Sequence, residues 1–148
     1  MNDLTTKHMT THHVTPATTP TFLKLWEEFV EGDAAKVDYT RKLLEGLLTH
    51  PHLGVALLED DYAGLLWVEV PQYPWSTERI AAGWGTYVRP DMRRTGVAKR
   101  LWEAASLDLK AKGFHSVILE PSLSDHHVIW GLHGAGFRGS KLQMKKDL

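Results

Sequence analysis

A turn between an apolar run and a helical pattern, within Val88 to Leu109, carries the residues with the clearest chemical potential. The first N–H groups of a helix lack intrahelical partners and lie at the positive end of the helix dipole, so phosphate oxygens can bind there. Gly96 lets a bulky anion approach the main chain, and Ala98 adds no side chain that would block it. Arg93 and Arg94 supply forked donors that suit phosphate. The stretch predicts an anion-binding turn, and the alternative is a solvated basic turn before an ordinary helix.

The sequence of this turn resembles a known family. Arg93-Arg94-Thr95-Gly96-Val97-Ala98 is similar to the Q/R-x-x-G-x-G/A signature of the GNAT superfamily of acetyl-CoA-dependent N-acetyltransferases. Val88-x-Pro90 sits at the family's V-x-P lead-in, Gly113-Phe114 follows the helix, and Gly136-Phe137 resembles the family's late G-F. The resemblance spans roughly Thr15 to Lys146 and is strongest after Arg79. It implies that acetyl-CoA is the cosubstrate, held by Tyr87, Val88, Arg93, Arg94, Thr95, Gly96, Val97, Ala98, Lys99 and Asp125.

Length and composition favour one globular domain. A chain of 148 residues can bury about two thirds of its unfolded surface. With 43% hydrophobic and 24% charged residues, it has the composition of a soluble protein. We expect residues 1–11 to be a mobile N-terminal leader and residues 12–148 to form the domain. The expected fold is α/β, with a mixed, mostly antiparallel sheet, flanking helices and a splayed parallel strand pair.

Charge and residue usage narrow the expected partners. The formal net charge is −1 and the pI about 6.8, so neither a nucleic acid nor a membrane partner is expected. The absence of cysteine excludes disulfides, thiolate metal sites and a cysteine nucleophile. Histidines near the start of the chain have no carboxylate or cysteine to complete a ligand set, and we expect no metal site. No apolar run approaches 18 residues, and no signal peptide is evident, so a cytoplasmic location is expected.

The apolar periodicity predicts alternating helices and strands. Thr19 reads as a helix N-cap with Pro20 at the first helical position, and Gly32-Asp33 ends that helix. Gly83 and Gly85 weaken the central strand but allow a ligand to approach its backbone. The expected strands cover 13–17, 53–58, 62–70, 79–88 and 115–120, with final strands from 137 and 141–145. The expected helices cover 19–30, 34–48, 97–109 and 125–136.

The resemblance also implies where the two substrates meet. In the family the central strand splays from the next one, the pantetheine arm lies in the gap, and the first two helices line the acceptor side. Trp26, Phe29 and Tyr39 are candidates for acceptor contacts, with core packing as the alternative reading. The sequence does not identify the acceptor itself.

Acetyl transfer to an amine needs a neutral amine, donors for the oxyanion and a proton for the thiolate. A free lysine amine has a pKa near 10.4, so only about one in a few thousand is neutral at pH 7. The backbone N–H of Val88 is the candidate oxyanion donor. Glu69, Glu78 and Glu120 are candidate bases, although each could be a solvated charge at a strand end. Many family members carry a carboxylate within the central strand, where this chain has Trp84, Gly85 and Thr86, which favours a base acting through water, or none.

The general acid departs from the family pattern. Counting back from Gly136 places Leu132 where the family usually has tyrosine and Asp125 where it has asparagine. Leucine cannot donate a proton, so either the thiolate leaves without help or His133, or one of its neighbours His126 and His127, takes the role. His133 points about 100° around the helix from Leu132. A half-buried surface histidine is the alternative reading.

Together these patterns predict an acetyl-CoA-dependent N-acetyltransferase. The acetyl group would pass directly to a primary amine of a small molecule or protein in a ternary complex, since no nucleophile suggests a covalent intermediate. Small amines or a peptide end are favoured because no second domain is expected. The alternatives are a non-catalytic acyl-CoA-binding or regulatory module and an enzyme that acetylates charged tRNA. A homodimer is common in the family, and Trp75 could serve one.

Overall fold

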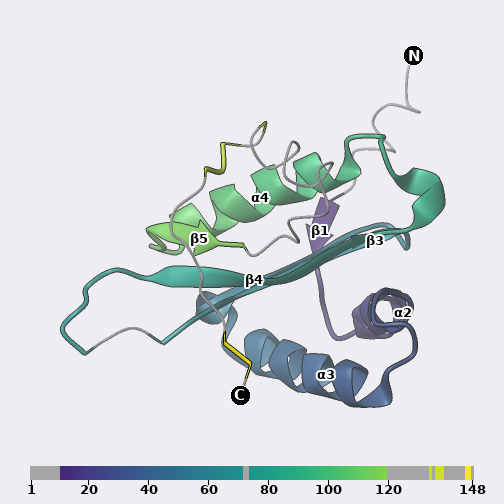
Figure 1. The fold of residues 1–148 in the computed structure, drawn as a ribbon, viewed down its shortest axis with the longest axis horizontal. Coiled ribbons are helices and arrows are strands. Elements are labelled where there is room, and N and C mark those ends of the chain that lie inside the picture. The colour runs from purple at the N-terminus through teal and green to yellow at the C-terminus, as the bar shows by residue number, and fades with distance from the viewer. Residues whose placement is uncertain (1–10, 72–73, 120–133, 135, 139–145, 148) are drawn as a thin grey trace.

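The computed structural model describes residues 11–71, 74–119, 134, 136–138 and 146–147. Within them, a five-stranded sheet follows the order of the sequence, β1-β2-β3-β4-β5. Neighbouring strands run antiparallel except β4 and β5, which are parallel. The predicted α/β class with a mixed, mostly antiparallel sheet is therefore confirmed (Figure 1). The strands are β1 (Thr11–His13), β2 (Gly54–Glu59), β3 (Ala63–Glu69), β4 (Ile80–Val88) and β5 (Ser116–Ile118).

Helices cover both faces of the sheet (Figure 1). α2 (Thr19–Phe29) and α3 (Ala34–Thr49) lie on one face, and α4 (Val97–Ala111) lies on the other. Side chains alternate along the strands, so each face has its own core. One core joins α2 and α3 to residues such as Leu58 and Leu66. The other joins α4 to residues such as Leu65 and Trp67.

The N-terminal elements begin slightly earlier than the sequence suggests. β1 ends at His13, and the predicted strand over 13–17 is wrong beyond that residue. Hydrogen bonds among Thr15, Thr18 and Thr19 instead form a turn there. Thr18, not Thr19, is the N-cap of α2, which moves Pro20 to the second helical position. Thr11, expected in the leader, is the first residue of β1.

α3 begins where the sequence predicts. The Asp33 side chain accepts hydrogen bonds from the N–H groups of Ala35 and Lys36, at 3.1 and 3.2 Å. These bonds satisfy two of the free donors at the helix start. The predicted break at Gly32 is confirmed, with φ of +77° at that residue.

A β-bulge interrupts the pairing of β3 with β4. Leu66 pairs with Gly85 and Trp67 with Gly83, so Trp84 is the extra residue. The bulge shifts the alternation of side chains between the two faces. Gly83 therefore faces Trp67 in the α4 core, whereas Gly85 faces Trp26 and Phe29 on the α2 side.

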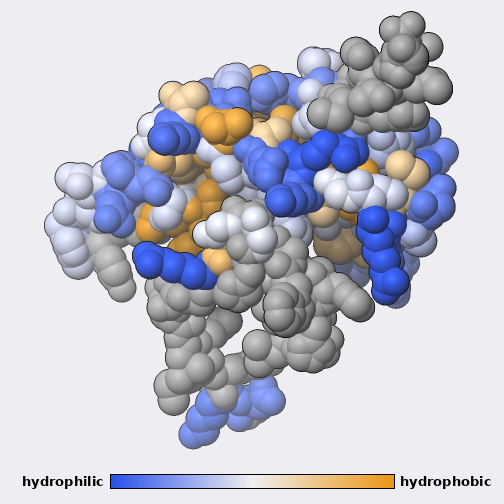
Figure 2. Space-filling model, turned by 90° about the horizontal axis from the view of Figure 1, so that it is seen from above, coloured by the Kyte–Doolittle hydropathy of each residue, from blue (hydrophilic) through white to orange (hydrophobic). Residues whose placement is uncertain are grey.

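The region beyond β5 is covered only in part. β4 pairs with β5 from Ile80 and Ser116 to Ala82 and Ile118. The expected helix over 125–136 and the expected final strands lie almost entirely outside the described residues, as does most of the leader. None of the helices in the described ranges has the length and apolar character needed to cross a membrane. Seen from the α4 side, hydrophobic residues cluster in one region of the surface and are surrounded by largely hydrophilic residues (Figure 2).

Candidate functional site

The edge of β4 opens beyond its short pairing with β5. From Gly83 to Val88, no strand in the described ranges pairs with β4 on that side. Val88 lies opposite Ala63 on β3, and Arg89 N–H donates to the carbonyl of Tyr62 at 2.8 Å. This pattern marks Val88 as a non-hydrogen-bonded pair, so its N–H points away from β3 and toward the open edge.

The open strand edge runs into a turn with two left-handed residues. The 3₁₀ turn η2 (Pro90–Met92) follows β4. Arg94 has φ of +64° and Gly96 has φ of +85°. Gly96 is the N-cap of α4 and has no side chain to bond the helix. Within the described part of the chain, no acceptor bonds the first N–H groups of α4, those of Val97, Ala98 and Lys99.

Side chains beneath the turn fix its shape. Arg93 Nε donates to the carbonyl of Val88 at 3.0 Å, and Thr95 Oγ1 donates to the carbonyl of Met92 at 2.6 Å. Arg93 therefore braces the turn, and both Arg93 and Arg94 are exposed. The predicted anion-binding residues are brought together at one helix start, at the end of β4.

Two observations test whether this edge and turn suit coenzyme A. A Cβ added to Gly96 would meet only Arg100 Nη1, at 3.6 Å, so the space over the turn is otherwise open. Trp67 is fully buried, and its Nε1 has no acceptor among the described residues. That nitrogen lies 3.3 Å from the position of a Cβ on Gly83, but the Leu119 side chain already occupies this position. The donors available to an anionic ligand are therefore the N–H groups at the start of α4, whereas Trp67 Nε1 is buried in the core on the α4 side.

Tyr87 lies on the face of β4 that is covered by α2 and α3. Its side chain is buried in the α2 core, and its hydroxyl donates to Glu28 Oε1 at 3.3 Å. Arg89 also binds Glu28, with Nη2 2.8 Å from Oε2. The Arg89 hydrogen bonds lower the pKa of Glu28, while burial and the nearby Glu28 charge raise the pKa of Tyr87. The side chain of Tyr87 is thus directed away from the open edge.

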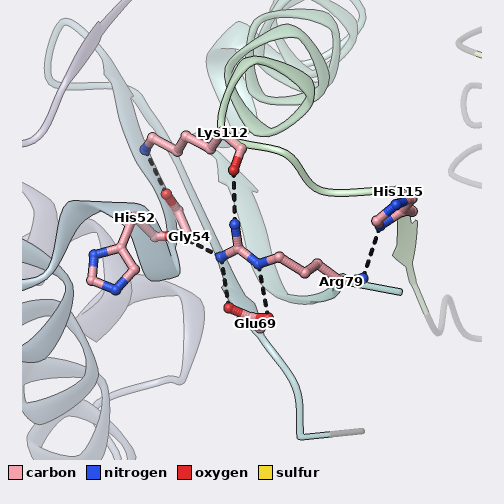
Figure 3. A network of polar contacts seen from close by, with 6 residues as sticks. All are labelled: His52, Gly54, Glu69, Arg79, Lys112 and His115. Atoms are coloured by element: carbon pink, nitrogen blue, oxygen red, sulfur yellow. Dashed lines mark hydrogen bonds and ion pairs between the residues drawn. The ribbon is translucent and has the colours of Figure 1, made fainter. Parts of the chain in front are cut away.

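Glu69 is held in an ion pair at the opposite end of β4 (Figure 3). Arg79 Nη2 lies 2.7 Å from Glu69 Oε1, and Arg79 Nε lies 3.1 Å from Oε2. The hydrogen bonds from Arg79 hold the pKa of Glu69 below its ordinary value. Glu69 lies opposite Ala81, about 20 Å along the strand from Val88. The structure does not bring this candidate base to the candidate oxyanion donor.

Arg79 also ties together three other segments. Its guanidinium donates to the carbonyls of Lys112 and His52 at 2.7 and 2.8 Å and lies 4.1 Å from the Phe114 ring centroid. Its N–H donates to His115 Nδ1 at 2.9 Å (Figure 3). This cluster therefore fastens the start of β4 to the end of α4. The other candidate catalytic residues, Glu120 and His133, and the candidate cofactor contact Asp125 lie outside the described residues.

The acceptor-side candidates divide between core and surface. Trp26 is buried, as the core reading predicts, whereas Phe29 and Tyr39 are exposed. Trp84 stands beside Tyr39, with ring centroids 5.1 Å apart. The two glycines of β4 indicated that a ligand could approach the backbone of this strand. The bulge at Trp84 was not predicted, because it leaves no signal in a single sequence. The ion pair of Glu59 with Arg100 has no local signal in the sequence, because the two residues lie 41 positions apart.

Comparison with known proteins places these features in context. The chain matches the model of the acetyltransferase (GNAT) family over residues 19–137. A comparison with curated proteins gave no match. Aminoglycoside N-acetyltransferase AAC(6')-Iy in complex with CoA has a TM-score of 0.77 and 17% identity, covering 94% of this chain and 93% of that one.

Two further solved structures are similar. Aminoglycoside antibiotic 6'-N-acetyltransferase AAC(6')-IG from Acinetobacter haemolyticus has a TM-score of 0.69 and 19% identity, covering 94% of this chain and 99% of that one. Glucosamine-6-phosphate N-acetyltransferase from Arabidopsis thaliana has a TM-score of 0.71 and 14% identity, covering 93% and 97%. At these identities the structural likeness establishes the fold.

Proposed function

The chain belongs to the acetyltransferase (GNAT) family, whose cosubstrate is acetyl-CoA, and we propose that it transfers the acetyl group directly to a primary amine of a small molecule or protein. The observation that carries the proposal is the open edge of β4, which leads into the unsatisfied N-terminus of α4.

The residues present suit both halves of coenzyme A. The N–H groups of Val97, Ala98 and Lys99 would hold the pyrophosphate, with Gly96 leaving room for it and the exposed Arg94 adding charge. The backbone from Gly83 to Val88 would pair with the amides of the pantetheine arm. Bound acetyl-CoA supplies a thioester that is activated toward amines.

Transfer forms a C–N bond and breaks the C–S bond, while the amine loses one proton and the departing thiolate gains one. The thioester lies at the end of the pantetheine arm away from the pyrophosphate. A backbone N–H toward the Gly83 end of the open edge would therefore donate to the carbonyl oxygen as negative charge develops there, while the N–H of Val88, which also faces the open edge, would pair with the arm. Thr86 lies two residues earlier, opposite Leu65, so its N–H has the same orientation. A backbone amide would thus stabilise the oxyanion without any side chain.

The base is the less specific part of this proposal. Glu69 is bound by Arg79, and its lowered pKa makes it a weaker base, which favours removal of the amine proton through water. Glu120 and His133 keep their proposed roles as base and acid. The acyl-CoA-binding module remains the second candidate because leucine replaces the family's tyrosine at position 132.

The direct test is release of free thiol from acetyl-CoA in the presence of a panel of primary amines. Turnover with at least one amine supports the proposal. Initial rates measured against both substrates should give intersecting lines, because transfer occurs in a ternary complex, whereas parallel lines would indicate a covalent acyl-enzyme. Tight binding of acetyl-CoA without thiol release on any amine would contradict the enzyme and favour the binding module.

A further inference from the structure

Three exposed aromatic side chains flank the β4 bulge on the face covered by α2 and α3. Phe29, Tyr39 and Trp84 are 40%, 54% and 43% exposed. They come from three different elements, α2, α3 and β4. Large aromatic side chains are usually covered by the core, so their gathering beside the open edge of β4 calls for a function.

The bulge holds this group in place. As the extra residue of the bulge, Trp84 reaches α3, where its Nε1 donates to Thr40 Oγ1 at 3.0 Å. Thr40 is buried, so the indole is anchored at its polar end. The ring of Tyr39 lies against Trp84 with an interplanar angle of 37°. On the other flank the Phe29 ring covers Gly85, where a Cβ would approach it to 2.7 Å.

A cavity of about 690 Å³ lies along α3, and its wall, as far as the structure describes it, does not include the three aromatic residues. Lys42, Leu43 and Gly46 of its wall lie three, four and seven residues after Tyr39, on the same face of the helix. The apolar wall is completed by Leu47, Leu53, Val68, Val70, Pro71 and Pro74. The cavity is therefore mainly apolar and lies on the same face of α3 as Tyr39.

The charges along this wall largely neutralise one another. Glu69 is paired with Arg79, and Lys42 Nζ lies 3.3 Å from Asp38. Glu78 is the remaining carboxylate among the described residues that line the cavity. A polycationic acceptor would need several unpaired carboxylates, whereas a flat, uncharged body needs the rings and apolar side chains that are present.

We infer that the acceptor is a primary amine joined by a short chain to an aromatic ring, with the ring lying against Tyr39 and Trp84. This inference rests on the proposed acetyltransferase activity and names the substrate class for the same site. The amine end would reach toward the open edge of β4, beside Trp84.

The test compares phenylethylamine with butylamine, a primary amine without a ring, and with neamine, a polycationic amino sugar. The wild type should show kcat/KM at least tenfold higher for phenylethylamine than for either alternative. Tyr39→Ala should lower the ratio of phenylethylamine to butylamine kcat/KM about 3- to 10-fold, through KM. Tyr39→Phe should keep most of the wild-type ratio. Leu107→Ala, at an exposed position on α4 on the opposite face of the sheet, should leave the ratio unchanged.

Equal kcat/KM for the two simple amines, or a preference for neamine that Tyr39→Ala leaves unchanged, would overturn the aromatic acceptor while acetyl transfer stands. Absence of thiol release with every amine would overturn the transferase itself. In that case, calorimetric titration of phenylethylamine into the CoA-loaded wild type and the CoA-loaded Tyr39→Ala variant still tests the ring site. Binding to the wild type that is lost in the variant supports the site, and equal binding to both proteins rejects it.

Discussion

Arg100 on α4 reaches across to Glu59 at the end of β2, with Nη2 2.5 Å and Nε 3.2 Å from Glu59 Oε1. Glu59 is fully buried, and Arg100 Nη1 also lies 3.5 Å from the carbonyl of Thr95 in the anion-binding turn. One guanidinium thus connects the sheet, the first turn of α4 and the turn that precedes it. The position of the helix start depends on this pair.

Arg100→Met should destabilise the protein by about 3 kcal/mol, because it leaves the Glu59 carboxylate buried without its cation. The double variant Glu59→Met/Arg100→Met should recover much of that loss, since two apolar side chains carry no desolvation penalty. Urea unfolding of the wild type, both single variants and the double variant measures the coupling. A double variant as unstable as the sum of the single variants would contradict a direct interaction.

Glu69→Gln should lower stability at pH 7 by about 1 kcal/mol, because it removes the charge that accepts two hydrogen bonds from Arg79. Its effect should fade in acid. The pKa of Glu69 is lowered in the folded state, so the unfolded chain binds more protons as pH falls, and stability is lost through the folded pKa.

Thermal unfolding between pH 7 and pH 3 checks this. The wild type should lose more stability over that range than Glu69→Gln. Glu103→Gln serves as a control, since Glu103 is exposed and 4.0 Å from Lys99. Parallel pH profiles for the wild type and Glu69→Gln would rule out the ion pair as a source of acid sensitivity.

Arg94→Asn should weaken CoA binding about tenfold through the loss of a charged donor. Stability should stay within about 0.5 kcal/mol, because asparagine tolerates the positive φ of this exposed residue. Arg94→Lys should retain more affinity, since it keeps the charge. Calorimetric affinities at two salt concentrations provide the check. An Arg94→Asn variant with wild-type affinity would remove this side chain from the phosphate site.

The elements with strong local signals follow the sequence closely. The inward face of α4 is predicted residue by residue, because apolar side chains recur at helical spacing from Val97 to Leu109. The hairpin of β2 and β3 follows from two apolar runs on either side of an acidic turn. The turn before α4 lies where the family signature predicts a turn, because backbone geometry there depends on a few residue types, above all Gly96.

Long-range contacts account for what the sequence left open. Trp84 enters a bulge because of pairing with β3, and no local pattern encodes that choice. Glu59 looks like a turn residue until Arg100, forty-one residues later, folds over it. Likewise, Glu69 resembled a free base, and only the fold brings Arg79 against it. For Glu59 and Glu69, partners that are distant in sequence therefore decide the role of the carboxylate.

The most direct test of the central claim uses the two left-handed glycines at the ends of α4. Gly96 and Gly113 have φ of +85° and +90°, and an added Cβ would meet a single arginine nitrogen at 3.6 or 3.7 Å. Alanine should therefore cost about 1 kcal/mol of stability at either position.

CoA is then titrated calorimetrically into the wild type, Gly96→Ala and Gly113→Ala. We expect CoA to bind the wild type and Gly113→Ala alike, and to bind Gly96→Ala at least tenfold more weakly. Failure of the wild type to bind CoA, or an equal loss of affinity in both variants, would contradict the assignment of the α4 N-terminus as the pyrophosphate site.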